Sequence, residues 1–154
     1  MKMEFDKKPF VKTKGFTLIE LMIVIVIIGV VLGFAIPSYI SYVQRSNRTE
    51  GITTMQALQL AEEKFRMTNS TYQTLSSVSF VPSFWPSTGI TSGVLTTENS
   101  LYTIVITGTS ATGYTITATA QGDQVNDDAG GTACTPMTLV VSGYTITKSP
   151  TACW

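Results

Sequence analysis

The longest apolar stretch of the chain covers residues 21–36 (LMIVIVIIGVVLGFAI) and holds no charged or strongly polar side chain. Extended back to Phe16, the stretch is interrupted only by Thr17 and Glu20. A helix of this length, at about 1.5 Å per residue, measures about 32 Å, close to the hydrocarbon thickness of a bilayer. A small domain cannot surround a helix that is apolar on every side, so the pattern predicts a membrane-spanning helix.

After Pro37 the pattern changes to that of an amphipathic helix, which is predicted to run to about Met67. Its apolar residues recur three or four positions apart, as expected for one helix face that packs on a sheet: Met55, Leu58, Ala61 and Phe65. The polar run at residues 68–71 predicts the end of the helix. The basic residues along it are interpreted as a solvated or subunit-facing stripe, Arg45, Arg48, Lys64 and Arg66, paired with Glu50, Glu62 and Glu63.

The second half of the chain has the alternating pattern of β-strands. Residues 102–107 and 114–119 predict one hairpin, and residues 137–141 and 144–147 predict a second. The expected fold class is therefore α+β, with a long helix (about 16–67) packed by its C-terminal half on a four-stranded antiparallel sheet. Residues 72–100 are predicted to be a loop whose aromatic side chains cap the core: Phe80, Phe84 and Trp85.

Between the two hairpins lies an acidic, turn-rich segment that contains Asp123, Asp127 and Asp128. Three aspartates within six residues could supply oxygen ligands to Ca²⁺, but their spacing lacks the order of an EF-hand and its final glutamate. We favour a solvated loop over a metal site here, although the sequence alone leaves the Ca²⁺ alternative open.

Candidate chemistry is sparse. The chain has no histidine, which removes Ser-His-Asp triads and Cys/His zinc sites, and no nucleophile and base stand out, so neither an enzyme nor a cofactor is predicted. The two cysteines, Cys134 and Cys153, suit one structural disulfide made in an oxidising compartment, since they form no C-x-x-C motif.

The formal net charge of zero hides two different regions. Residues 1–15 carry five lysines against two acidic residues, whereas residues 16–154 carry five basic and eight acidic ones. The basic flank places the start of the chain in the cytoplasm, so everything after about residue 40 is expected on the other side of the membrane, in the periplasm or the exterior of a bacterial cell. Residues 67–154 have a single basic side chain, Lys148, against four acidic ones, so this part is not expected to bind duplex DNA appreciably.

Glu20 needs an explanation, because a carboxylate at the edge of an apolar span is costly and is usually present for a partner. No basic residue lies within the span, and no A-x-A-like signal cleavage site follows it. Cleavage after Gly15 would create a partner, the α-amino group of Phe16, which Glu20 of a neighbouring copy could meet in a helix bundle.

The segment Lys14 to Met22 (KGFTLIELM), with a basic leader before it and the apolar run after it, resembles the prepilin signature of type IV pilins. The resemblance implies a cleaved leader (1–15), a transmembrane and filament-core helix (16–37) and a periplasmic or extracellular head (38–154). It implies that a prepilin peptidase cuts after Gly15, that the Phe16 amine is methylated, and that Glu20 registers an incoming subunit. Gly29, Gly33 and Pro37 stand where the family has helix-weakening residues, and the cysteines would bound the C-terminal disulfide region.

The resemblance further implies an inner-membrane subunit, held by lipid and an assembly platform, that joins other pilin subunits in an extracellular pilus. The segments after Met55 and around the two cysteines look most like minor pilins of the type IVa system, which serve pilus assembly, twitching motility, adhesion or DNA uptake. Two alternatives stay open, a type II secretion pseudopilin and a DNA-receptor competence pilin. Asn47 and Asn69 begin glycosylation-like triplets, to which no modification is assigned.

Overall fold

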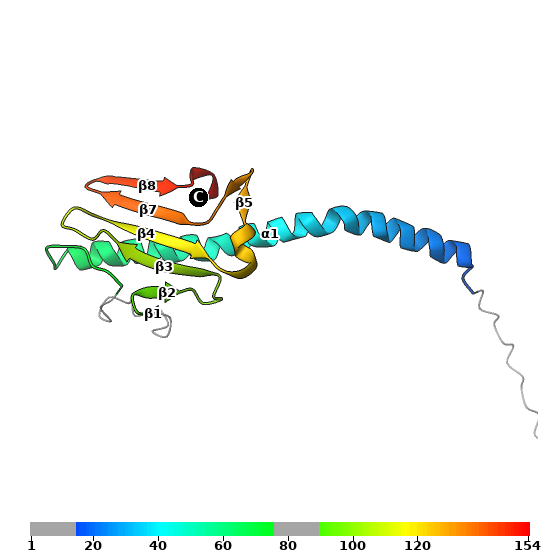
Figure 1. Ribbon diagram of the computed structural model, residues 1–154, viewed down its shortest axis with the longest axis horizontal. Helices are drawn as coiled ribbons and strands as arrows, with labels where there is room; N and C mark the ends of the chain where they lie inside the picture. Colours follow the sequence, from blue (N-terminus) through cyan, green and yellow to red (C-terminus); the bar gives the residue numbers. More distant parts are fainter. Residues whose placement is uncertain (1–14, 76–89) are drawn as a thin grey trace, which may run out of the picture. The chain divides into compact units, whose positions relative to one another are not determined.

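The computed structural model describes residues 15–75 and 90–154. They contain one long helix, α1 (Leu18–Arg66), followed by a region of strands (Figure 1). The chain divides into two compact units, Met1–Ser38 and Tyr39–Trp154, which we describe separately and of which the second is called the head.

In the first unit, α1 is helical through the whole apolar stretch, and its apolar side chains are exposed. By length and composition, this helix could cross a membrane. Pro37 lies inside the helix, and the Ser38 hydroxyl donates a hydrogen bond to the carbonyl of Phe34. Gly29 and Gly33 are also helical here, so the proposed weakening of this segment stays a prediction.

The head contains a six-stranded antiparallel sheet in the order β1-β2-β3-β4-β7-β8 (Figure 1). The strands are β1 (Ile90–Thr91), β2 (Val94–Thr96), β3 (Tyr102–Thr107), β4 (Gly113–Ala120), β7 (Met137–Ser142) and β8 (Thr145–Ser149). Two short strands, β5 (Asp128–Ala129) and β6 (Thr132–Ala133), pair with each other. Two 3-10 helices complete the head, η2 (Gly122–Asn126) and η3 (Thr151–Cys153).

The predicted α+β architecture is confirmed, but the sheet is larger than expected. The four predicted strands correspond to β3, β4, β7 and β8, whereas β1 and β2 lie in the segment that we expected to be a loop. They form a hairpin whose turn residues, Ser92 and Gly93, both have positive φ, as in type I′ turns. Strands of two and three residues are too short to show an alternating pattern. The aromatic residues Phe80, Phe84 and Trp85 lie outside the described residues.

The core of the head lies between α1 and one face of the sheet. Met55 and Leu58 are buried as predicted, and Ala61 and Phe65 pack against the same cluster. Opposite them, alternate residues of β3, β4 and β7 are buried, as the two-residue period of a strand requires. Gly51 lets the helix approach the sheet closely, because a Cβ there would lie 3.1 Å from atoms of Tyr102 and Met137.

Candidate functional site

The residues of the prepilin-like signature lie at the start of α1. Gly15 and Phe16 precede the helix, and Phe16 is 84% exposed. The Thr17 hydroxyl accepts a hydrogen bond from the Glu20 backbone N–H at 3.2 Å, and the Thr17 carbonyl accepts one from Leu21 N–H. Thr17 is therefore the N-cap of the helix. Our sequence reasoning missed this role, although Thr17 and Glu20 have the spacing of a capping box.

Glu20 is exposed in the first turn of α1, where a carboxylate interacts favourably with the helix dipole. Within residues 15–75 and 90–154 the single salt bridge joins Arg48 to Asp127. Glu20 thus has no cationic partner in the described part of its own chain. This geometry leaves its carboxylate available to a cation from another molecule.

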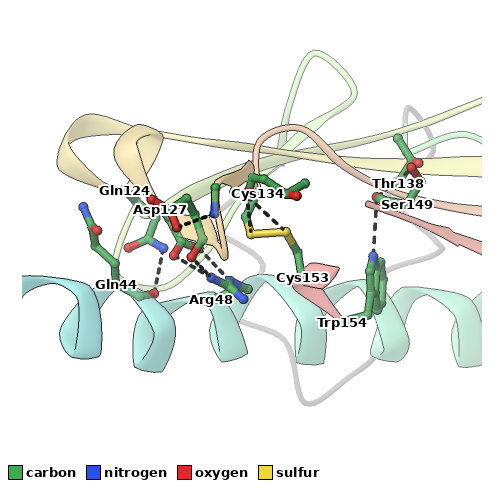
Figure 2. The surroundings of a disulfide bond; sticks show 12 residues. Gln44, Arg48, Gln124, Asp127, Cys134, Thr138, Ser149, Cys153 and Trp154 are labelled. Atoms are coloured by element: carbon green, nitrogen blue, oxygen red, sulfur yellow. Dashed lines mark hydrogen bonds and ion pairs between the residues drawn. A yellow bond between two sulfur atoms is a disulfide. The ribbon is translucent and has the colours of Figure 1, made fainter. Parts of the chain in front are cut away.

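A buried ion pair connects α1 to the segment that follows β4. Arg48 Nε lies 2.7 Å from Asp127 Oδ2, and Arg48 Nη2 lies 2.7 Å from Asp127 Oδ1 (Figure 2). The two side chains are only 7% and 2% exposed, and Arg48 Nη2 also donates to the carbonyl of Asp128. The hydrogen bond to Asp127 raises the pKa of Arg48 above its ordinary value. A two-point pair of this kind fixes the orientation of both groups.

The predicted stripe of charges paired with glutamates is wrong for Arg48 and Arg66, whereas Arg45 and Lys64 are exposed, as expected of a solvated stripe. Arg48 points into the head, Arg66 donates to the carbonyls of Ala111 and Asn69, and Glu62 is buried. Burial alone would raise the pKa of Glu50, but hydrogen bonds from Thr97 and from the side chain and backbone of Asn99 together lower it below its ordinary value. The strands and loops of the head bring partner groups closer to these charged side chains than the neighbouring turns of the helix do.

The prediction of a solvated acidic loop is wrong for Asp127, which is buried by its contact with Arg48, whereas Asp123 and Asp128 are exposed. The preceding residues form η2, where the Gln124 amide donates to the carbonyl of Gln44 and to the Tyr102 hydroxyl. Burial raises the pKa of Tyr102 to about 12, so this phenol stays neutral. No group of acidic residues suited to a metal ion occurs in the part of the chain that the structure describes.

The predicted disulfide between Cys134 and Cys153 is confirmed. Cys134 donates its backbone N–H to the Asp127 carbonyl at 2.9 Å, so the bridge lies directly beside the buried ion pair (Figure 2). The tail has further attachments that we did not expect: β8 continues to Ser149, whose carbonyl accepts a hydrogen bond from the Trp154 indole. Lys148 Nζ lies 4.6 Å from the centre of the Trp154 ring, a cation–π contact.

The comparisons with known proteins agree with this arrangement. A family model described as type IV minor pilin ComP, DNA uptake sequence receptor, matches residues 37–138, about two thirds of the chain. The chain belongs to this family. A second model, the prokaryotic N-terminal methylation motif, matches residues 11–36 and so includes Gly15, Phe16 and Glu20. The chain is thus a type IV pilin in which the methylation motif is followed by a ComP-like head.

Curated relatives match part of this ComP-family chain. The type IV major fimbrial protein FimA of Dichelobacter nodosus is 53% identical over 47 residues, which are 30% of this chain and 29% of FimA. The type IV major pilin PilA of Myxococcus xanthus is 39% identical over 72 residues, 46% of this chain and 33% of PilA. The chain thus spans about a third of the length of these relatives. No solved structure matches it significantly.

Proposed function

We propose that this chain is a minor subunit of a type IV pilus that is cleaved after Gly15, methylated at Phe16 and built into a filament through its N-terminal helix. The start of α1 gives the main support for this proposal. There, Glu20 is exposed, has no cationic partner in the described chain, and lies three residues after the capping Thr17. A cut after Gly15 produces a new amine, and Glu20 of a neighbouring subunit pairs with it. The role is structural and not catalytic.

Before assembly, the helix holds the subunit in the inner membrane with the head in the periplasm; after assembly the head is extracellular. Its partners are the prepilin peptidase, the inner-membrane assembly platform and other pilin subunits, with Gly29, Gly33 and Pro37 easing the transfer of the helix from lipid to filament. The pilus would serve motility, adhesion or DNA uptake. The disulfide and the ComP family match favour a pilus subunit over a type II secretion pseudopilin.

Replacing Glu20 by Ala tests the proposal. The variant should insert in the membrane at least as well as the original chain, because removing a charge lowers the cost of insertion. It should be nearly absent from sheared pili, because the amine of Phe16 would lack its partner. In the original chain, the intact mass of the pilus-borne subunit should equal residues 16–154 with one methyl group.

The matched control is Glu50→Ala, which removes a carboxylate of the same helix that is already bonded to Asn99 within its own chain. This control should appear in sheared pili at a level close to that of the original. Equal incorporation of the Glu20 variant, or a pilus-borne subunit that retains its basic leader, would contradict the proposal.

The ComP family match favours a second candidate function, that of a receptor for DNA. The charges of the head argue against strong binding through the phosphate backbone, since residues 39–154 carry five basic and seven acidic side chains, a net of −2. Arg48 is buried against Asp127, and Arg66 and Lys148 are engaged with Ala111 and Trp154. A receptor built on this head would have to rely on base contacts and not on charge.

A titration of the full chain in neutral detergent with short DNA duplexes, at about 0.15 M salt, distinguishes the two functions. We expect binding of random duplexes to be weaker than micromolar. A receptor would bind one sequence, selected from a random pool, at least about tenfold more tightly than its scrambled form. Micromolar binding of random duplexes that weakens in Lys148→Ala would contradict the charge argument.

A further inference from the structure

Glu62 is a buried carboxyl group on α1 that takes no part in the proposed function. Its side chain is fully buried, at 0% exposure, and one of its oxygens, Oε2, accepts a hydrogen bond from the Gln73 backbone N–H at 3.1 Å. The other oxygen, Oε1, has no hydrogen-bond partner among the residues that the structure describes. The contact joins the helix to Gln73, seven residues after the helix end at Arg66.

Among the described residues, the groups around Glu62 include no cation to balance a negative charge. On its own helix the nearest charged neighbour is Glu63, a second carboxylate, which accepts hydrogen bonds from the hydroxyls of Tyr72 and Tyr114. These two tyrosines, from the segment after the helix and from β4, have ring centres 4.6 Å apart, and burial raises the pKa of both. Arg66 is bonded to the carbonyls of Ala111 and Asn69.

The residues that directly follow Leu75 in the sequence carry no charge either. Residues 76–89 contain no acidic, basic or tyrosine side chain, so they cannot provide an ion pair for Glu62. An ionised carboxylate without a partner is strongly disfavoured in a site that excludes water. The carboxyl group can relieve this cost by binding a proton or by becoming hydrated.

We infer that Glu62 is a pH-sensitive latch, which holds the Gln73 backbone on α1 while it is protonated and releases it to water when it ionises. This inference concerns the head alone and does not depend on the proposed function. It predicts that the attachment of Gln73 to α1 is firm in mildly acidic surroundings and loosens as the surroundings become slightly alkaline.

The direction follows from the proton affinities of the two states. Burial raises the pKa of Glu62 from 4.5 to about 7, with the neighbouring Glu63 adding to the shift and the Gln73 amide opposing it. The closed state therefore binds the proton more tightly than an open, hydrated state does, and stability of the closed state is lost as the pH rises from 4.5 towards 7 and slightly above. For these two affinities, the opening constant should rise about tenfold between pH 6 and pH 8.

Hydrogen exchange at the Gln73 amide measures this opening in the full chain in detergent micelles, because that amide is the one bonded to Glu62. After division by the intrinsic exchange rate, its protection should fall about tenfold between pH 6 and pH 8. The Asn99 amide is a matched internal control, since it donates to Glu50, whose pKa is lowered. Its protection should not change over this range.

In Glu62→Gln, the protection of Gln73 should lose its pH dependence, and Glu62→Met serves the same purpose if the amide variant does not fold. Carboxyl NMR on the original chain gives an answer that needs no variant. A Glu62 pKa near 4.5, a flat protection of Gln73, or the same slope in the variants would overturn the inference.

Discussion

Replacing Arg48 by Met should lower the free energy of unfolding by about 3–5 kcal/mol, the largest effect expected from a single substitution here. The variant leaves the Asp127 carboxylate buried, at 2% exposure, without its two-point partner. The cost comes from this uncompensated charge more than from the lost bonds. Urea unfolding of the full chain in detergent, followed by a tyrosine and tryptophan signal from the head, measures it.

Two further variants separate the buried pair from a general effect of losing an arginine. Arg45→Met removes an exposed arginine one turn earlier and should change stability by no more than about 0.5 kcal/mol. Arg48→Met combined with Asp127→Leu removes both buried charges and should recover most of the loss. If the double variant were as unstable as the single one, packing would explain the loss better than charge.

Replacing Cys134 or Cys153 by Ser should lower the free energy of unfolding by about 3 kcal/mol, since the bridge closes a loop of 19 residues in the unfolded chain. The two single variants and the double variant should lose similar amounts, because each removes the same bond. Loss of the disulfide should also weaken the hydrogen bond that the Asp127 carbonyl accepts from the Cys134 N–H.

Increased proteolysis in these cysteine variants should be confined to the residues after Ser149. Up to that residue, β8 remains paired with β7, with Ser149 opposite Thr138. Limited proteolysis with mass spectrometry locates the cuts. Thiol labelling of both cysteines in the native, unreduced chain would show that the bridge is absent and would contradict the prediction.

Features that depend on neighbouring residues were predictable from the sequence alone. The long apolar run and the spacing of Met55 and Leu58 predicted one helix, because a helix repeats every few residues. Alternating Thr and apolar residues predicted four of the strands for the same local reason. Gly15, Phe16 and Glu20 also lie within a few positions of one another, so a short motif was enough to mark them as a candidate site. The disulfide was predictable because the chain has only two cysteines.

Which polar side chains are buried depends on contacts between residues that are distant in the sequence, and these became visible in the fold. Arg48 meets Asp127 across 79 positions of sequence, and Glu62 meets the Gln73 amide where the chain turns back after the helix. From the sequence, these residues are expected to be solvent-exposed charges on a helix and in a loop. The identity of a residue does not show which face of the helix the sheet covers. The short strands β1 and β2 were equally hidden, since they are stabilised by pairing, β1 with β2 and β2 with β3, and not by their own two or three residues.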